Sequence, residues 1–172
     1  ADTINSWIKT STKDKIDKML DPPIPSDVVM YLINAVYFKG DWETQFNKEN
    51  TYNTFFNGVN KNNQSVDMMS RRGSIDYGIG DDFQVVRLPY GDGKVSMYVI
   101  LPILNQNINA FIELMDEKKF RTIKSSLEST EEVTLNFPKF KMEYGIKELN
   151  KELAAMGMQN PFTPDADFSD IR

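Results

Sequence analysis

The chain has 172 residues, of which 40% are apolar or aromatic and 26% are charged, a composition ordinary for a globular chain that can bury a sizeable core. Its 20 basic and 25 acidic residues give a net charge of −5, so nucleic acid is not expected as a partner. No run of apolar residues approaches the roughly 18 that a membrane span needs, so no membrane partner is expected either.

Helical spacing and a proline-rich stretch organise the first 25 residues. Ile4, Trp7 and Ile8 recur on one helical face, which predicts a helix over Thr3–Thr10. Lys13–Leu20 is predicted to form a second short helical turn. The three prolines of residues 21–25 then form a rigid linker, because each fixes φ and removes a backbone donor.

The next segment, Val28–Phe38, is apolar or aromatic at every position except Asn34. A β-branched and aromatic run of this length without a period predicts a strand that is covered on both faces. Lys39-Gly40 ends the run and Trp42 follows. A buried amide in such a strand must be hydrogen-bonded, since an unpaired one costs about 1–3 kcal/mol. The Asn34 side chain is therefore expected to be buried and hydrogen-bonded inside a central sheet.

The middle of the chain predicts antiparallel strands. Glu43–Phe56 reads as extended, and Asn57-Gly58 is a strong turn dipeptide. The clearest hairpin joins Gln84–Tyr90 to Lys94–Leu101 through Gly91-Asp92-Gly93.

Two helices, a strand and a further helix are predicted in the last third. Asn107–Met115 has helical spacing, and a second helix carries Phe120, Ile123 and Leu127. Alternation predicts a half-buried strand that ends at Pro138. A last helix should end at Gly157, a favoured C′ residue, and presents one apolar face made of Ile146, Leu149, Leu153 and Met156.

The sequence excludes most of the common catalytic and metal-binding motifs. The chain has no His and no Cys, which removes Ser-His-Asp and Cys-His machinery, disulfides and thiolate zinc sites. Ser6-Trp7-Ile8-Lys9 fits the S-x-x-K pattern but lacks its companion motifs, so a chance match is the better interpretation. Asp165–Asp170 lacks the Gly and Glu of a calcium loop. No catalytic residue, metal or cofactor is predicted, and the chain is not expected to be an enzyme.

The segment Asn34–Trp42, NAVYFKGDW, resembles the third strand of the main sheet in serpins, the serine protease inhibitor family. Further motifs fall in the order in which serpins carry them, and the resemblance covers essentially all 172 residues. These motifs are Ile4-Asn5-Ser6-Trp7-Ile8, Val66-Asp67-Met68-Met69, Leu88-Pro89-Tyr90, Ile100-Leu101-Pro102, Phe137-Pro138-Lys139-Phe140-Lys141, Met156-Gly157-Met158 and Ala166-Asp167-Phe168-Ser169.

The resemblance implies an α+β fold, with mixed antiparallel sheets and packed helices. Residues 1–172 would form a partial serpin domain, running from the helix that crosses the main sheet to just before the strand that leads to the reactive loop. The reactive site is then expected outside this chain. Asn34 would lie in the shutter beneath the opening strands, and Trp42 at the breach where the loop enters the sheet.

The implied function of the parent protein is inhibition of a serine-type endopeptidase, through cleavage of the reactive loop and its insertion into the main sheet. The expected partners are a target serine or cysteine protease and complementary segments of the same parent protein, in an extracellular setting. The alternative is a non-inhibitory serpin-fold module that binds other molecules or acts as a chaperone. The hinge before the reactive site discriminates these two functions, because small residues there allow insertion.

Overall fold

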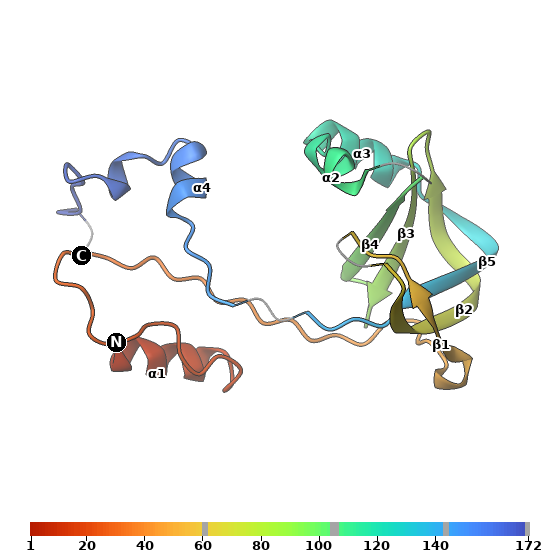
Figure 1. The fold of residues 1–172 in the computed structure, drawn as a ribbon, viewed down its shortest axis with the longest axis horizontal. Coiled ribbons are helices and arrows are strands. Elements are labelled where there is room, and N and C mark those ends of the chain that lie inside the picture. Colours follow the sequence, from red (N-terminus) through yellow and green to blue (C-terminus); the bar gives the residue numbers. More distant parts are fainter. Residues whose placement is uncertain (60–61, 104–106, 143–144, 171–172) are drawn as a thin grey trace. The chain divides into compact units, whose positions relative to one another are not determined.

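The computed structural model describes residues 1–59, 62–103, 107–142 and 145–170. These residues form two compact units (Figure 1). The helical unit consists of residues 1–37 and the described part of 142–172, and the sheet unit is Phe38–Lys141. Helices and an antiparallel sheet in one chain confirm the predicted α+β class.

The sheet unit is built around one long strand, β2 (Gln64–Ile79), which pairs antiparallel with three others. Its first residues pair with β1 (Thr51–Phe56), and residues 76–79 pair with β3 (Phe83–Tyr90). Along most of its length β2 also pairs with β5 (Glu128–Pro138). The strand β4 (Val95–Pro102) completes the order β1-β2-β3-β4 by pairing with β3.

The β3–β4 hairpin confirms the sequence prediction to within one residue at each end. Gly91 and Gly93 have φ of 51° and 80°, values that L-residues with a Cβ rarely adopt. Upstream, the predicted extension over residues 43–56 is interrupted by a 3-10 turn at Lys48–Asn50. The Asn47 side chain begins this turn by accepting the Glu49 N–H at 3.0 Å, so the strand itself starts only at Thr51.

Both faces of β3 are buried, and each belongs to a different core cluster. Val86 and Leu88 pack with Ile75 and Phe137 in the first cluster. Phe83 and Val85 point to the opposite face, as strand alternation requires. There they pack in the second cluster with Phe111 and Ile123.

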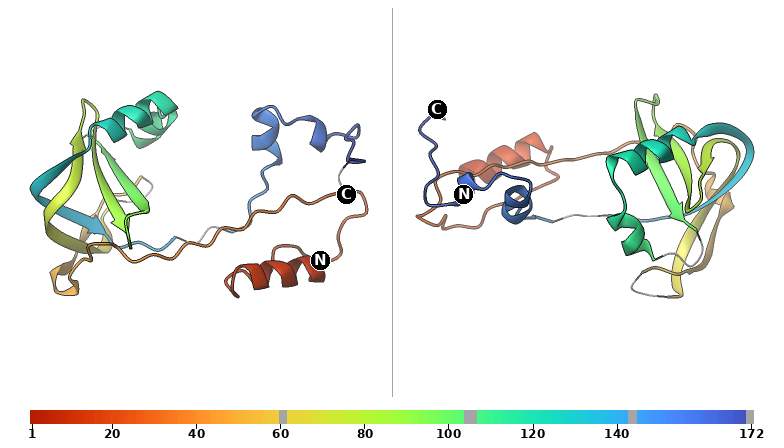
Figure 2. Two further views of the ribbon diagram at one scale, coloured as in Figure 1. Left: turned by 180° about the vertical axis from the view of Figure 1, so that it is seen from behind. Right: turned by 90° about the horizontal axis from the view of Figure 1, so that it is seen from above.

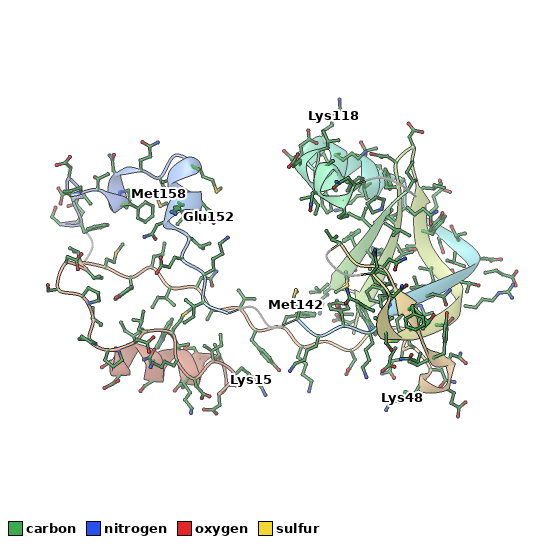
Figure 3. The ribbon with its side chains drawn as sticks, in the orientation of Figure 1. Lys15, Lys48, Lys118, Met142, Glu152 and Met158 are labelled. Carbon is green, nitrogen blue, oxygen red and sulfur yellow. The ribbon has the colours of Figure 1, made fainter. Side chains whose placement is uncertain are left out.

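Two short helices supply the second cluster, and Figure 2 shows them over one end of the β3–β4 hairpin. The helix α2 (Ile108–Glu113) begins at Asn107, whose side chain accepts the Asn109 N–H at 2.9 Å. The helix α3 (Glu117–Ser125) begins at Asp116, which accepts the Lys119 N–H at 2.6 Å. Lys118, on the outer side of α3, extends away from the sheet (Figure 3).

In the helical unit, α1 (Asp2–Ser11) confirms the first predicted helix. The predicted helical turn at Lys13–Leu20 is wrong. Lys13 and Asp14 have φ of 52° and 59°, which stops the helix. The Asn5 side chain then accepts the Met19 and Leu20 N–H groups at 2.9 and 3.0 Å, so these donors bond to a side chain instead of a helix.

The last helix, α4 (Asn150–Ala155), is shorter than its apolar pattern, but its predicted end is confirmed. Gly157 has φ of 105° and its N–H donates to Ala154 O, while the Met158 N–H donates to Leu153 O. This pair of bonds is a Schellman motif with Gly at C′. Figure 3 labels Glu152 of α4, which forms an ion pair with Lys147 at 2.9 Å, and Met158, the last residue of the motif.

The prediction of a covered strand at Val28–Phe38 is wrong for this chain. The segment has no regular secondary structure and is drawn as coil in Figure 1. Val29, Leu32 and Val36 are each 79% exposed. A strand needs backbone partners on at least one edge, and no described strand pairs with this segment. Its first half instead forms one wall of an open groove with Ile4 and Trp7 of α1.

Candidate functional site

Trp42 lies against the carboxyl end of β3. Its ring stacks on Tyr90, with 4.3 Å between the ring centroids and 17° between their planes. The two residues also form an isolated antiparallel bridge. On either side of this bridge, the Glu43 N–H donates to Pro89 O and the Gly91 N–H donates to Asp41 O, both at 2.9 Å. Residues 41–43 are therefore held to β3 by backbone bonds as well as by ring contact.

The segment before Trp42 contacts the same tyrosine. Phe38 meets Tyr90 edge to face, with 4.8 Å between centroids. Gly40 lies between them. A Cβ at this position would come within 3.0 Å of Phe38 Cζ and 3.1 Å of Tyr90 Cδ1. The absence of a side chain at Gly40 thus permits the aromatic contacts.

Arg71 of β2 approaches the same region from the sheet. Its Nη1 donates to Thr44 O at 2.9 Å, and its guanidinium carbon lies 5.5 Å from the centre of the Phe46 ring. A small hollow is lined by Trp42, Thr44, Phe46, Arg71, Leu88 and Pro89. We call the side chains of Phe38, Trp42, Phe46, Arg71 and Tyr90 the Trp42 cluster.

Burial changes the acid–base properties of two members of the Trp42 cluster. It lowers the pKa of Arg71 and raises the pKa of Tyr90, because each loses hydration of its charged form. Nearby, Arg87 donates through Nε to Asp76 Oδ2 at 2.7 Å, and this hydrogen bond raises the pKa of Arg87. The contacts of the cluster connect residues 38–46 to β2 and to the end of β3.

The two residues singled out from the sequence have different outcomes. Trp42 is partly buried and packs against the first core cluster. Asn34 belongs to the helical unit, and the expectation of a buried, hydrogen-bonded amide is wrong in this chain. Its side chain is exposed because the segment around it lacks a sheet partner among the described residues. The shutter role of Asn34 and the breach role of Trp42 remain predictions.

Sequence reasoning missed Arg71 and Phe46 as members of the site. The residues around Arg71 do not show which face of the strand it occupies, because Met68 and Met69 are consecutive and point to opposite faces. Among the described residues, no group of three acidic side chains is placed to hold a metal ion. Within the same ranges, no helix has the length and apolar character to cross a membrane.

Comparison with known proteins identifies the family. The family model described as "Serpin (serine protease inhibitor)" matches residues 1–172. An uncharacterized serpin-like protein of Methanosarcina acetivorans is 38% identical over 171 residues, which cover 99% of this chain and 40% of that protein. Intracellular coagulation inhibitor 2 of Tachypleus tridentatus is 33% identical over 168 residues, covering 96% and 41%. The chain belongs to the serpin family, and the resemblance seen in its motifs is confirmed.

Solved structures agree on the fold. The thermophilic serpin tengpin in its native state matches with a TM-score of 0.85 and 35% identity, over 95% of this chain and 41% of tengpin. Tengpin in its latent state matches with a TM-score of 0.79, over 96% and 44%. The chain thus spans about 40% of the length of the curated relatives that it matches.

Proposed function

We propose that the full-length protein inhibits a serine or cysteine endopeptidase by presenting a reactive loop as a substrate. Cleavage lets the loop insert as a strand into the main sheet, while the protease is still held as an acyl-enzyme and becomes distorted. The protein then acts as a ligand of a protease and not as an enzyme. The observation that carries this proposal is the match of the serpin family model over all 172 residues.

The exposed state of Val28–Phe38 supports this proposal. The segment carries apolar side chains at both even-numbered and odd-numbered positions, yet it has no pairing partner among the described residues. Unpaired strand backbone is a template for adding another strand. We propose that complementary segments of the parent protein pair with it, so that Asn34 becomes buried in the shutter of the main sheet.

Trp42 takes the breach role in the same proposal. Its ring and backbone are held to the end of β3 by the Tyr90 stack and by two backbone bonds. A firm attachment at residues 41–43 would leave the preceding segment free to part from a neighbouring strand without loss of the sheet unit.

The Tachypleus relative is named as intracellular, so the proposed extracellular location rests on the resemblance to other serpins.

The test mixes the full-length protein with a trypsin-like or a chymotrypsin-like protease and examines the products on a denaturing gel. The proposal expects a covalent complex that survives boiling in detergent. A protease whose catalytic serine is replaced by alanine is the control, and it should give no such complex. Cleavage of the loop should also raise the melting temperature, because the inserted strand satisfies sheet hydrogen bonds. A cleaved protein that melts where the intact one does favours the non-inhibitory binding or chaperone module.

A further inference from the structure

Arg71 occupies a position on β2 where an apolar side chain is the ordinary choice. In the β2–β5 register, Met69 is opposite Phe137 and Arg71 is opposite Leu135. Met69, Phe137 and Leu135 all belong to the first core cluster. Residues directly opposite one another in antiparallel strands share a face, so Arg71 projects from the core face of the sheet.

The contacts of Arg71 lead away from the sheet and toward a single chain segment. Its Nη1 donates to Thr44 O, and its guanidinium lies over the Phe46 ring. The Nε atom is buried and has no acceptor among the described residues. A planar guanidinium holds its donors in a fixed fork and stacks on aromatic faces, which a linear ammonium side chain cannot do at once. Arg71 therefore fixes both the backbone and a ring of residues 44–46.

Arg71 contacts the chain immediately after the residues that are bonded to the end of β3. Backbone bonds hold residues 41–43 to Pro89 and Gly91, and Arg71 holds Thr44 immediately afterwards. On this edge of β2, the described structure has no paired strand between the end of the β1 ladder at Met69 and the start of the β3 ladder at Asp76. The Arg71 side chain joins the segment to β2 across that interval.

We propose that Arg71 is a positioning residue, which seats Trp42 against Tyr90 by anchoring the segment that follows it. The functional consequence of this positioning, which is that a loosened Trp42 would ease opening of the main sheet, rests on the proposed inhibitory function. The positioning itself can be measured whether or not the protein inhibits a protease.

The adjacent Arg72 is a matched control. It lies on the opposite face of the same strand, is 67% exposed, and pairs with the exposed Glu132 at 3.1 Å. Arg72→Met therefore removes a cation and an ion pair from β2 without touching residues 42–46. Arg71→Met keeps an unbranched side chain over Phe46 and removes the donors. Arg71→Lys keeps the charge and loses the fork.

The experiment labels the full-length protein with 5-fluorotryptophan and records ¹⁹F spectra, in which the resonance lost from Trp42→Phe is that of Trp42. Arg71→Met is expected to shift this resonance by more than its linewidth, Arg71→Lys to shift it in the same direction, and Arg72→Met to leave it in place. A folded Arg71→Met protein with the wild-type resonance overturns the proposal, as does an equal shift in Arg72→Met. If Arg71→Met does not fold, Arg71→Lys decides, and a wild-type resonance there overturns it.

Conversion on heating gives the functional readout. Each variant is incubated below its melting temperature, and the loss of the native monomer is followed on a native gel. Arg71→Met is expected to convert several-fold faster than the wild type, and Arg72→Met at the wild-type rate. If Arg71→Met and the wild type convert at equal rates while the Trp42 resonance is shifted, the proposed effect on sheet opening is wrong and the positioning role still holds. A protein that forms no protease complex but shows the shift contradicts only the proposed function.

Discussion

Replacement of Trp42 by alanine tests how firmly the Trp42 cluster is packed. The ring is partly buried, contacts the first core cluster and stacks on Tyr90. A buried aromatic side chain removes about 150–250 Å² from water, and loss of about half of that area at about 25 cal/mol per Å² costs about 2–3 kcal/mol. The lost aromatic pair adds about 0.5–1.5 kcal/mol. Trp42→Ala is therefore expected to lower the free energy of unfolding by about 2.5–4.5 kcal/mol.

The assay is urea unfolding of the full-length protein, followed by far-ultraviolet circular dichroism. Phe55→Ala is the control, because Phe55 lies on β1 and is 72% exposed, so its truncation should change the free energy of unfolding by about 0.5 kcal/mol or less. Trp42→Phe keeps an aromatic ring beside Tyr90 and should fall between the two. A Trp42→Ala protein no less stable than Phe55→Ala would refute the view that this ring is an anchored part of the core.

Three further predictions concern the unpaired segment Val28–Phe38 and the partly buried Tyr90. Asn34→Ala should destabilise the full-length protein by about 1–3 kcal/mol and give latent or polymeric forms on a native gel after gentle heating; wild-type stability and a persistent monomer would contradict the shutter assignment. Leu32→Lys should reduce the aggregation of the 172-residue chain alone, measured by light scattering, because it places a charge on an exposed apolar segment; unchanged scattering, or a cooperative melt of the unmodified monomer, would sink the expectation that this chain needs complementary segments. Burial raises the pKa of Tyr90 above its ordinary 10.0. The contribution of the neutral tyrosine to stability is therefore complete below pH 10 and is lost as the pH rises through the folded-state pKa. Above pH 10, Tyr90→Phe should lose less stability than the wild type, and parallel pH profiles of the two unfolding free energies would argue against this.

Local chemistry made several elements predictable. The β3–β4 hairpin was found because Gly91 and Gly93 supply positive φ between two apolar runs. The end of α4 was found because Gly157 can adopt the left-handed conformation at C′. The helices α2 and α3 follow from apolar spacing and from side-chain caps at Asn107 and Asp116. In each case a few neighbouring residues decide the conformation.

The long strand β2 was less accessible to such reasoning. It runs for 16 residues through polar positions and through Gly73, where its register with β5 shifts. Only the partners show that Arg71 faces the core while Arg72 faces solvent, because face is defined by the register of the paired strands. The membership of Arg71 in the Trp42 cluster could not have been read from its neighbours in sequence.

The sequence by itself determined the family, through the order of its motifs, and the turns and helix ends that depend on adjacent residues. The tertiary structure decided the state of Val28–Phe38, whose apolar residues predict a strand that the chain does not form. A strand is completed by the backbone of a neighbour, and the described residues supply none for this segment. The structure likewise decided that Trp42 and Arg71 belong to one cluster, because residues far apart in the chain meet only after the sheet has paired.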